Sequence, residues 1–136
     1  MIGAAHKHDY ARGLVLSNDG GFVIAGHTYN EGVGKDDVVL AKLNSLGSPE
    51  WIKILGGPDI DYTRRIINLK DGGYLVCGHT ESFSSDYDIF LIRFNSLGEV
   101  IWEKRFGDYS ERELCWGLAE SEIGGFLYIG GSSDGF

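Results

Sequence analysis

The chain has 136 residues, 43% of them hydrophobic and 12% aromatic, which suits the core of one folded domain and excludes a disordered chain. Its formal net charge of −8 excludes a surface built to hold nucleic acid, because phosphate contacts require clustered Lys and Arg. No apolar run approaches the roughly 18 residues that span a bilayer, and the first residues contain no apolar segment of signal-peptide length. We therefore expect neither a membrane span nor a signal peptide.

Four short runs with the composition of β-strands come first along the chain, at residues 11–17, 22–27, 38–43 and 51–55. The first two are separated by Asp19-Gly20, a pair that supplies the positive φ of a tight hairpin turn. The last two are separated by a turn that ends at Gly47. With 21 glycines, only two prolines and no segment of helical period, the chain is predicted to be all-β.

The same runs then return. Residues 71–80 (DGGYLVCGHT) repeat residues 19–28 (DGGFVIAGHT), and the tetrapeptide Asn-Ser-Leu-Gly at 44–47 recurs at 95–98. A third copy reaches residues 124–132 (GGFLYIGGS). Internal repeats of this length indicate stacked structural units. We expect two complete units, at about 9–57 and 61–108, and a partial one at about 113–136.

Both faces of the second and third runs of each unit are apolar, whereas a sheet exposed to water on one side alternates apolar with polar residues. These sheets are therefore expected to be covered on both faces. The fourth run is charged, as an edge strand often is, and carries Lys53 in the first unit and Glu103, Lys104 and Arg105 in the second. The predicted fold is a β-propeller with four-stranded antiparallel blades, of which about two and a half are present.

Three elements of the repeat carry a family resemblance: Asp-Gly-Gly-(Phe/Tyr)-x-x-x-Gly-x-Thr, then Asp-x-x-Leu-x-(Lys/Arg)-x-Asn-Ser-x-Gly, then Trp-x-Lys-x-x-Gly. This pattern resembles the β-propeller repeats of bacterial and archaeal surface or secreted proteins, and more loosely kelch repeats. Kelch repeats place the double glycine after the strand that it precedes here, so we favour the prokaryotic group. The resemblance covers essentially the whole chain and implies an extracellular or cell-surface location.

Closed propellers have typically 4–8 blades, so we expect the chain to be a segment of a longer propeller. Self-association through the terminal blades is the alternative.

Structural roles are expected where a residue recurs at one position of the repeat. The glycines are expected to form turns, the tryptophans to cover the core between blades, and the histidines to form hydrogen bonds. These residues are Gly20, Gly21, Gly72, Gly73, Trp51, Trp102, His27 and His79. Cys77 and Cys115 lie in predicted strands and are expected to be buried free thiols.

Long loops at one end of the blades form a predicted acidic loop face, which we expect to attract a cation, a basic peptide or a hydroxyl-rich ligand. Its members are Asp9, Glu31, Asp36, Asp37, Asp59, Asp61, Glu81, Asp86, Asp88, Asp108, Glu111, Glu113 and Asp134. If the face binds Ca²⁺, the candidate ligands are Asp36, Asp37, Asp86 and Asp88. No other cofactor is expected. The alternative is a solvated face on which Asp37 and Asp88 hydrogen-bond turn backbone.

Arg12 and Arg64 recur at the start of the first strand of their units, and Trp116 fills that position in the third. Two roles are open for this row: lining the mouth of a central channel, or pairing of the arginines with Asp9 and Asp61. We take Arg12, Arg64, Trp116, Asp59 and Asp61 as candidate ligand contacts.

Function is predicted less sharply than fold. The preferred hypothesis is a non-enzymatic propeller segment that serves as a binding or structural module for a protein or carbohydrate ligand. The alternative is a fragment of a propeller-fold enzyme, of glycosidase or lyase type, whose catalytic blades lie outside this chain. Near-identical units favour the first hypothesis, because enzymatic sites combine unlike acid, base and nucleophile residues.

Overall fold

A computed structural model describes residues 8–29, 34–83, 87–107 and 112–132, which form ten strands and no helix. Sheet 1 has the order β1 (Asp9–Leu16), β2 (Phe22–Tyr29), β3 (Asp36–Leu43), β4 (Pro49–Leu55). Sheet 2 repeats that order with β5 (Asp61–Asn68), β6 (Tyr74–Thr80), β7 (Asp88–Phe94), β8 (Val100–Phe106). Sheet 3 pairs β9 (Glu113–Glu120) with β10 (Phe126–Ser132). All strand pairings within the three sheets are antiparallel, and the all-β prediction is confirmed.

The double glycine of the repeat has two separate structural reasons. Gly20 has a φ of 81° and Gly72 one of 85°, which L-residues with a side chain rarely adopt, so the first glycine permits the hairpin turn. The second glycine, Gly21 or Gly73, lies against a backbone carbonyl at the end of the third strand of its sheet, where a Cβ would not fit. The sequence Asp-Gly-Gly therefore permits the turn and also its close packing against the neighbouring strand.

The turns between the third and fourth strands are held by an asparagine. The Oδ1 of Asn44 accepts hydrogen bonds from the backbone N–H groups of Leu46 (3.0 Å) and Ser48 (2.9 Å). Asn95 accepts the same two bonds in the second unit. Such local side-chain bonds replace a backbone turn, which explains why Asn-Ser-Leu-Gly recurs.

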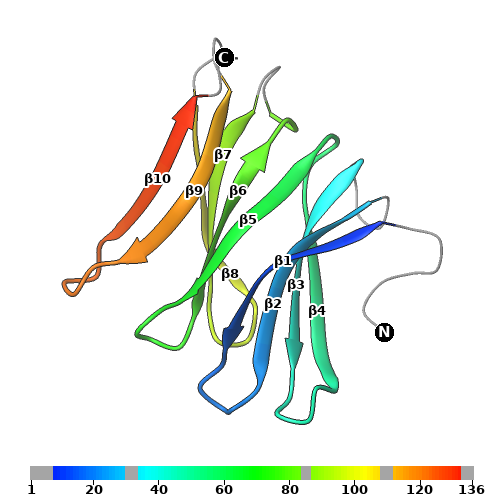
Figure 1. The fold of residues 1–136 in the computed structure, drawn as a ribbon, viewed down its shortest axis with the longest axis vertical. Coiled ribbons are helices and arrows are strands. Elements are labelled where there is room, and N and C mark those ends of the chain that lie inside the picture. The colour runs from blue at the N-terminus through cyan, green and yellow to red at the C-terminus, as the bar shows by residue number, and fades with distance from the viewer. Residues whose placement is uncertain (1–7, 30–33, 84–86, 108–111, 133–136) are drawn as a thin grey trace.

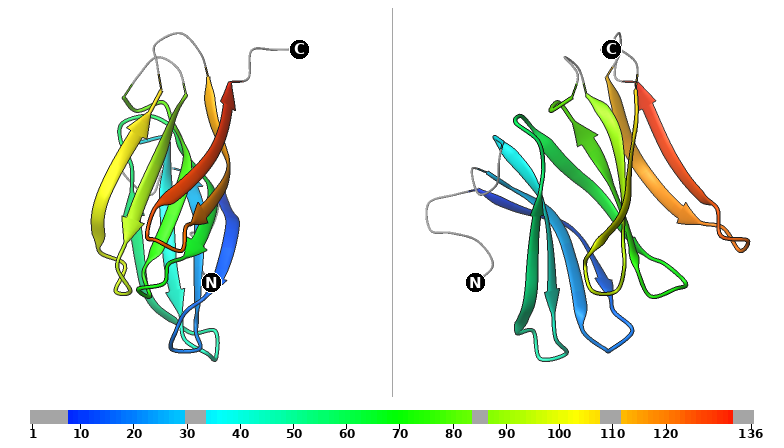
Figure 2. Two further views of the ribbon diagram at one scale, coloured as in Figure 1. Left: turned by 90° about the vertical axis from the view of Figure 1, so that its left-hand side faces the viewer. Right: turned by 180° about the vertical axis from the view of Figure 1, so that it is seen from behind.

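The three sheets are stacked face against face, with their first strands β1, β5 and β9 side by side (Figure 1). Figure 2, seen from behind, shows β4 and β8 on the opposite side of the stack. One apolar cluster joins Val23 and Leu40 of sheet 1 to Val76 and Phe90 of sheet 2. A second cluster joins Leu75, Cys77, Ile89 and Leu91 of sheet 2 to Cys115, Leu118 and Phe126 of sheet 3. Sheet 2 is thus covered on both faces.

The described residues cover only one face of sheet 1, the face toward sheet 2. Leu14 and Leu16, which point away from sheet 2, are 58% and 61% exposed. The tryptophans of the fourth strands lie at the junctions between sheets: Trp51 lies against Gly98 in the β7–β8 turn, and the Trp102 ring centroid is 5.8 Å from that of Phe126. Each tryptophan therefore packs on the next sheet along the chain.

Cys77 of β6 and Cys115 of β9 form a disulfide across the junction of sheets 2 and 3, between residues 38 positions apart. The prediction of two free thiols is wrong. The repeat explains why: at the junction of sheets 1 and 2 the equivalent residues are Ala25 and Thr63, and there the Thr63 hydroxyl donates to the Gly26 carbonyl at 2.6 Å. Stacking of successive units brings these two positions together, and two cysteines placed there can bond.

No helix that could cross a bilayer occurs among the residues with described positions.

Candidate ligand-binding cavity

The first strand of every sheet contains a β-bulge at the same position of the repeat. The register shifts around Arg12 in β1, around Arg64 in β5 and around Trp116 in β9. A bulge leaves one residue out of the hydrogen-bonded ladder and redirects its side chain. The three residues predicted to form a row are therefore the residues that the bulges set apart.

A glycine stands opposite the bulges of sheets 1 and 2. A Cβ on Gly26 would collide with the carbonyl group of Tyr10, and a Cβ on Gly78 would collide with that of Tyr62. Only glycine lets the two strands approach this closely. The glycine that precedes His27 and His79 in the repeat thus belongs to the geometry of the bulge.

A cavity of about 440 Å³ opens along the first strands, beside the bulges. Its lining combines three arginines, two histidines and three tyrosines with one threonine and one leucine, and these lining residues include no carboxylate or thiol. They are Tyr10, Arg12, His27, Tyr62, Thr63, Arg64, His79, Tyr87, Arg112 and Leu114. Residues from all three repeats contribute to it.

Five of the lining side chains form a continuous aromatic row, Tyr10–His27–Tyr62–His79–Tyr87. Successive ring centroids are 5.0, 4.6, 5.2 and 4.7 Å apart. The row crosses from sheet 1 to sheet 2, and contacts between rings at these distances are favourable. It gives the cavity a wall of closely packed rings.

Each arginine of the cavity lies over an aromatic ring. The guanidinium carbon of Arg12 is 5.3 Å from the ring centroid of Tyr10, that of Arg64 is 5.5 Å from Trp116, and that of Arg112 is 4.7 Å from Tyr87. These are cation–π distances. The contacts restrain the guanidinium groups. Because the rings carry no net charge, they do not neutralise the positive charge of the arginines.

Pairing of Arg12 with Asp9 and of Arg64 with Asp61, one of the two roles left open for this row, is not found: no ion pair among the described residues includes either arginine. The Asp9 carboxylate accepts from the Thr28 hydroxyl. Asp61 accepts from the Gly57 N–H at 2.7 Å and the Ser82 hydroxyl at 2.8 Å. Both carboxylates are thus held by their own sheet or loop.

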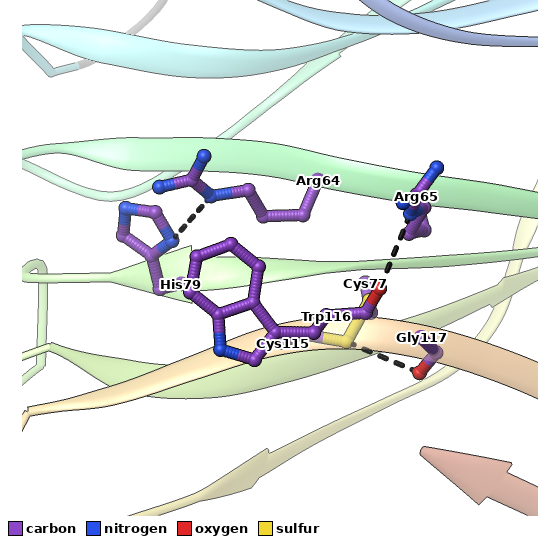
Figure 3. The surroundings of a disulfide bond; sticks show 7 residues. All are labelled: Arg64, Arg65, Cys77, His79, Cys115, Trp116 and Gly117. Carbon is purple, nitrogen blue, oxygen red and sulfur yellow. Dashed lines mark hydrogen bonds between the residues drawn. A yellow bond between two sulfur atoms is a disulfide. The ribbon is translucent and has the colours of Figure 1, made fainter. Parts of the chain in front are cut away.

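The two histidines are buried and differ in their bonding. His79 Nδ1 accepts a hydrogen bond of 3.4 Å from Arg64 Nε, while His27 Nδ1 has no partner among the described residues. Figure 3 shows Arg64 above His79 and Trp116, in the surroundings of the Cys77–Cys115 disulfide.

Burial, with the nearby arginine charges, lowers the pKa of His27 to about 4. The same causes, burial first and then Arg64, lower the pKa of His79 to about 3. Both imidazoles are neutral at pH 7.

Several members of the predicted acidic loop face form local bonds in the described part of the chain. Asp37 accepts from the Gly34 N–H, Asp59 forms a 2.7 Å ion pair with Lys35, and the Tyr62 hydroxyl bonds Asp36. Burial, followed by the charge of Asp37, raises the pKa of Asp36. These three carboxylates therefore bond loop backbone, a lysine and a tyrosine. Other predicted members of the face lie outside the described residues: Glu31, Asp108, Glu111 and Asp134.

The candidate Ca²⁺ ligands do not form a metal site in the described part of the chain. Asp88 Oδ1 is buried and has no hydrogen-bond partner among the described residues, and Asp86 lies outside them. No group of three or more His, Cys, Asp or Glu side chains suited to a metal ion occurs where positions are described.

The sequence predicted that Arg12 and Arg64 share a row, but it did not predict the tyrosines and histidines that line the cavity with them. Tyr10 and Tyr62 occupy equivalent positions two residues before these arginines, and this repeat is the signal that could have found them. Trp116 contacts Arg64, while Asp59 is engaged outside the lining.

The chain matches no protein-family model, and no curated protein was found to be similar to it. Its function is therefore inferred from the cavity and the sheets.

Proposed function

We propose that this chain is a β-propeller segment that acts as a non-enzymatic binding module, with its ligand site in the cavity along the first strands. Propellers arrange four-stranded sheets around a central channel. The repeated strand order of sheets 1 and 2, their face-to-face stacking and the adjacent first strands support this arrangement. The kelch-like pattern of the prokaryotic repeat family supports it independently.

The observation that carries the binding role is the cavity. Its volume of about 440 Å³ falls within the range of small-molecule sites, and successive repeats supply equivalent residues to it: Tyr10 and Tyr62, Arg12 and Arg64. The bulges set Arg12 and Arg64 apart from the hydrogen-bonded ladder, so that both arginines line this space. The ligand is a carbohydrate or a short protein segment that can enter this space.

The lining favours binding over catalysis. A glycosidase requires two carboxyl groups beside the scissile bond, and the cavity walls given above contain none. The hydroxyl of Thr63 is committed to the Gly26 carbonyl, and His79 to Arg64. The side chains that line the cavity are therefore better suited to binding a ligand than to catalysing its conversion.

The disulfide supports a location in an oxidising compartment, because disulfides persist mainly in exported proteins. We accordingly propose a surface or secreted location, in agreement with the resemblance of the repeats.

A thermal-shift screen of neutral sugars, acidic sugars, short peptides and phosphates tests the binding role. Leu114 lines the cavity, so Leu114→Trp, or Leu114→Phe if the larger residue prevents folding, should block entry. Leu97→Trp, in an exposed turn, is the matched control. We expect at least one compound to raise the melting temperature of the native chain and of the control, but not of the blocked variant.

NMR spectra of that compound after prolonged incubation should be unchanged. Conversion of the compound would refute the non-enzymatic role. A shift that the blocked variant retains in full would refute the location of the site.

A further inference from the structure

We propose that the cavity binds an oxyanion, the carboxylate or phosphate group of a small ligand, between Arg12, Arg64 and Arg112. This inference rests on the proposed function of the same cavity and adds the chemical class of its ligand. A neutral ligand would leave these three charges without a counter-ion among the residues that the structure describes.

The first argument is charge. The chain carries 20 acidic against 12 basic residues, yet among the residues that the structure describes, three arginines and no carboxylate line the cavity. Elsewhere, cations such as Lys35, Lys42, Arg93 and Arg105 form ion pairs with Asp or Glu. In the described part of the chain, the three arginines of the cavity do not. A local positive potential in an acidic protein selects for an anion.

The second argument is an unpartnered polar atom. His27 lines the cavity, is only 2% exposed, and its Nδ1 has no hydrogen-bond partner among the residues that the structure describes. Buried polar atoms are normally bonded. Because a neutral imidazole can carry its proton on either nitrogen, this Nδ1 can donate to a ligand oxygen.

The third argument is preorganisation. Arg12 and Arg64 project from bulges and lie over the rings of Tyr10 and Trp116, and Arg112 lies over Tyr87. A cation–π contact uses none of the N–H donors of a guanidinium group, and these donors match a carboxylate or phosphate with two parallel hydrogen bonds. Little side-chain entropy then remains to be lost on binding.

Two carboxylates near the cavity, Asp36 and Glu81, bond tyrosine hydroxyl groups. The hydroxyl of Tyr62 bonds Asp36, and that of Tyr87 bonds Glu81. The tyrosine rings face the cavity while their hydroxyl groups hold the acids, so an incoming anion meets donors and aromatic carbon.

The test uses inorganic phosphate, D-glucuronate and D-glucose as probes on the native chain. Binding is followed by NMR, through the arginine Nε–Hε and histidine imidazole resonances, at millimolar concentrations. We expect phosphate and glucuronate to shift the resonances of Arg12, Arg64, Arg112 and His27. Glucose, which has the same ring as glucuronate without its charge, should leave them unchanged.

Variants separate this site from general charge attraction. Arg12→Gln and Arg64→Gln should each weaken glucuronate binding at least about tenfold, because each removes charged hydrogen bonds. Arg12 is exposed and lies over the ring of Tyr10, so its variant should fold even if Arg64→Gln does not. Arg105→Gln removes one cation from β8, away from the lining, and should change the affinity less than about twofold.

Three results would overturn the inference. Glucose that binds as tightly as glucuronate would show a neutral ligand site and leave the proposed binding role intact. Equal weakening in Arg105→Gln would show attraction to overall charge. No shift at the cavity resonances with either anion would exclude an oxyanion site, and the blocked Leu114 variant would then decide the binding role by itself.

Discussion

Removal of the Cys77–Cys115 disulfide should destabilise the protein strongly. The informative variant is Cys77→Ala with Cys115→Thr, because Ala25 and Thr63 hold the equivalent positions between sheets 1 and 2. The variant therefore exchanges the covalent link for a pair that the chain already uses at its other junction. Packing changes are kept small, and the loss of the link dominates.

The magnitude follows from the length of chain that the link closes. A separation of 38 residues corresponds to about 4 kcal/mol of stabilisation at 25 °C in the loop-entropy model. For a chain of this size, that free energy amounts to roughly 10–15 °C in melting temperature.

The assay is thermal or urea unfolding of the native chain and the double variant, each with and without a reductant. We expect the reductant to lower the stability of the native chain to near that of the variant and to leave the variant unchanged. Mass spectrometry after alkylation under denaturing conditions should find no free thiol in the oxidised native chain.

Two results would refute this reasoning. Alkylation of both cysteines without reductant would show that the bond does not form. Equal melting temperatures of the oxidised and reduced native chain, with the bond demonstrated, would show that the junction of sheets 2 and 3 is held by packing alone.

Acid should destabilise the fold below pH 6.5, because His27 and His79, with pKa values near 4 and 3, stay neutral while the unfolded chain takes up protons. Each should contribute a loss of about 2 kcal/mol between pH 7.5 and 5 in urea unfolding, and a slope unchanged in His79→Gln would contradict this. Gly78→Ala should lower stability by at least about 2 kcal/mol, measured in the same way, since its Cβ meets a backbone carbonyl. Thr63→Val should lose about 1–2 kcal/mol through its bond to the Gly26 carbonyl, whereas Thr63→Ser, with the hydroxyl retained, should lose clearly less.

The strands and turns could be predicted from sequence because their signals are local. Asp-Gly-Gly and Asn-Ser-Leu-Gly each specify a turn by conformation or by a side-chain bond within five residues. The apolar runs of β6 and β7 likewise predicted the covering of sheet 2 on both faces, because alternation of polarity is a property of the strand alone.

The disulfide and the cavity could not be predicted in this way. Which face of one unit meets which face of the next is a property of the stack, so Cys77 and Cys115 could be placed in strands but not opposite one another. The bulges at Arg12 and Arg64 break strict alternation by one residue, which turns side chains that a regular ladder would direct elsewhere. Counting charges by loop predicted an acidic face, while the direction of a few side chains produced a basic cavity.

The bulge also separates the residues that pair the strands from the residues that can contact a ligand. Arg12, Arg64 and Trp116 occupy one position of three successive units, and each is the residue that the strand ladder does not use. Substitution there leaves the backbone pairing of the sheet intact. Replication of a unit followed by a single codon change can thus add or alter one contact to a bound molecule, and selection can revise specificity one repeat at a time.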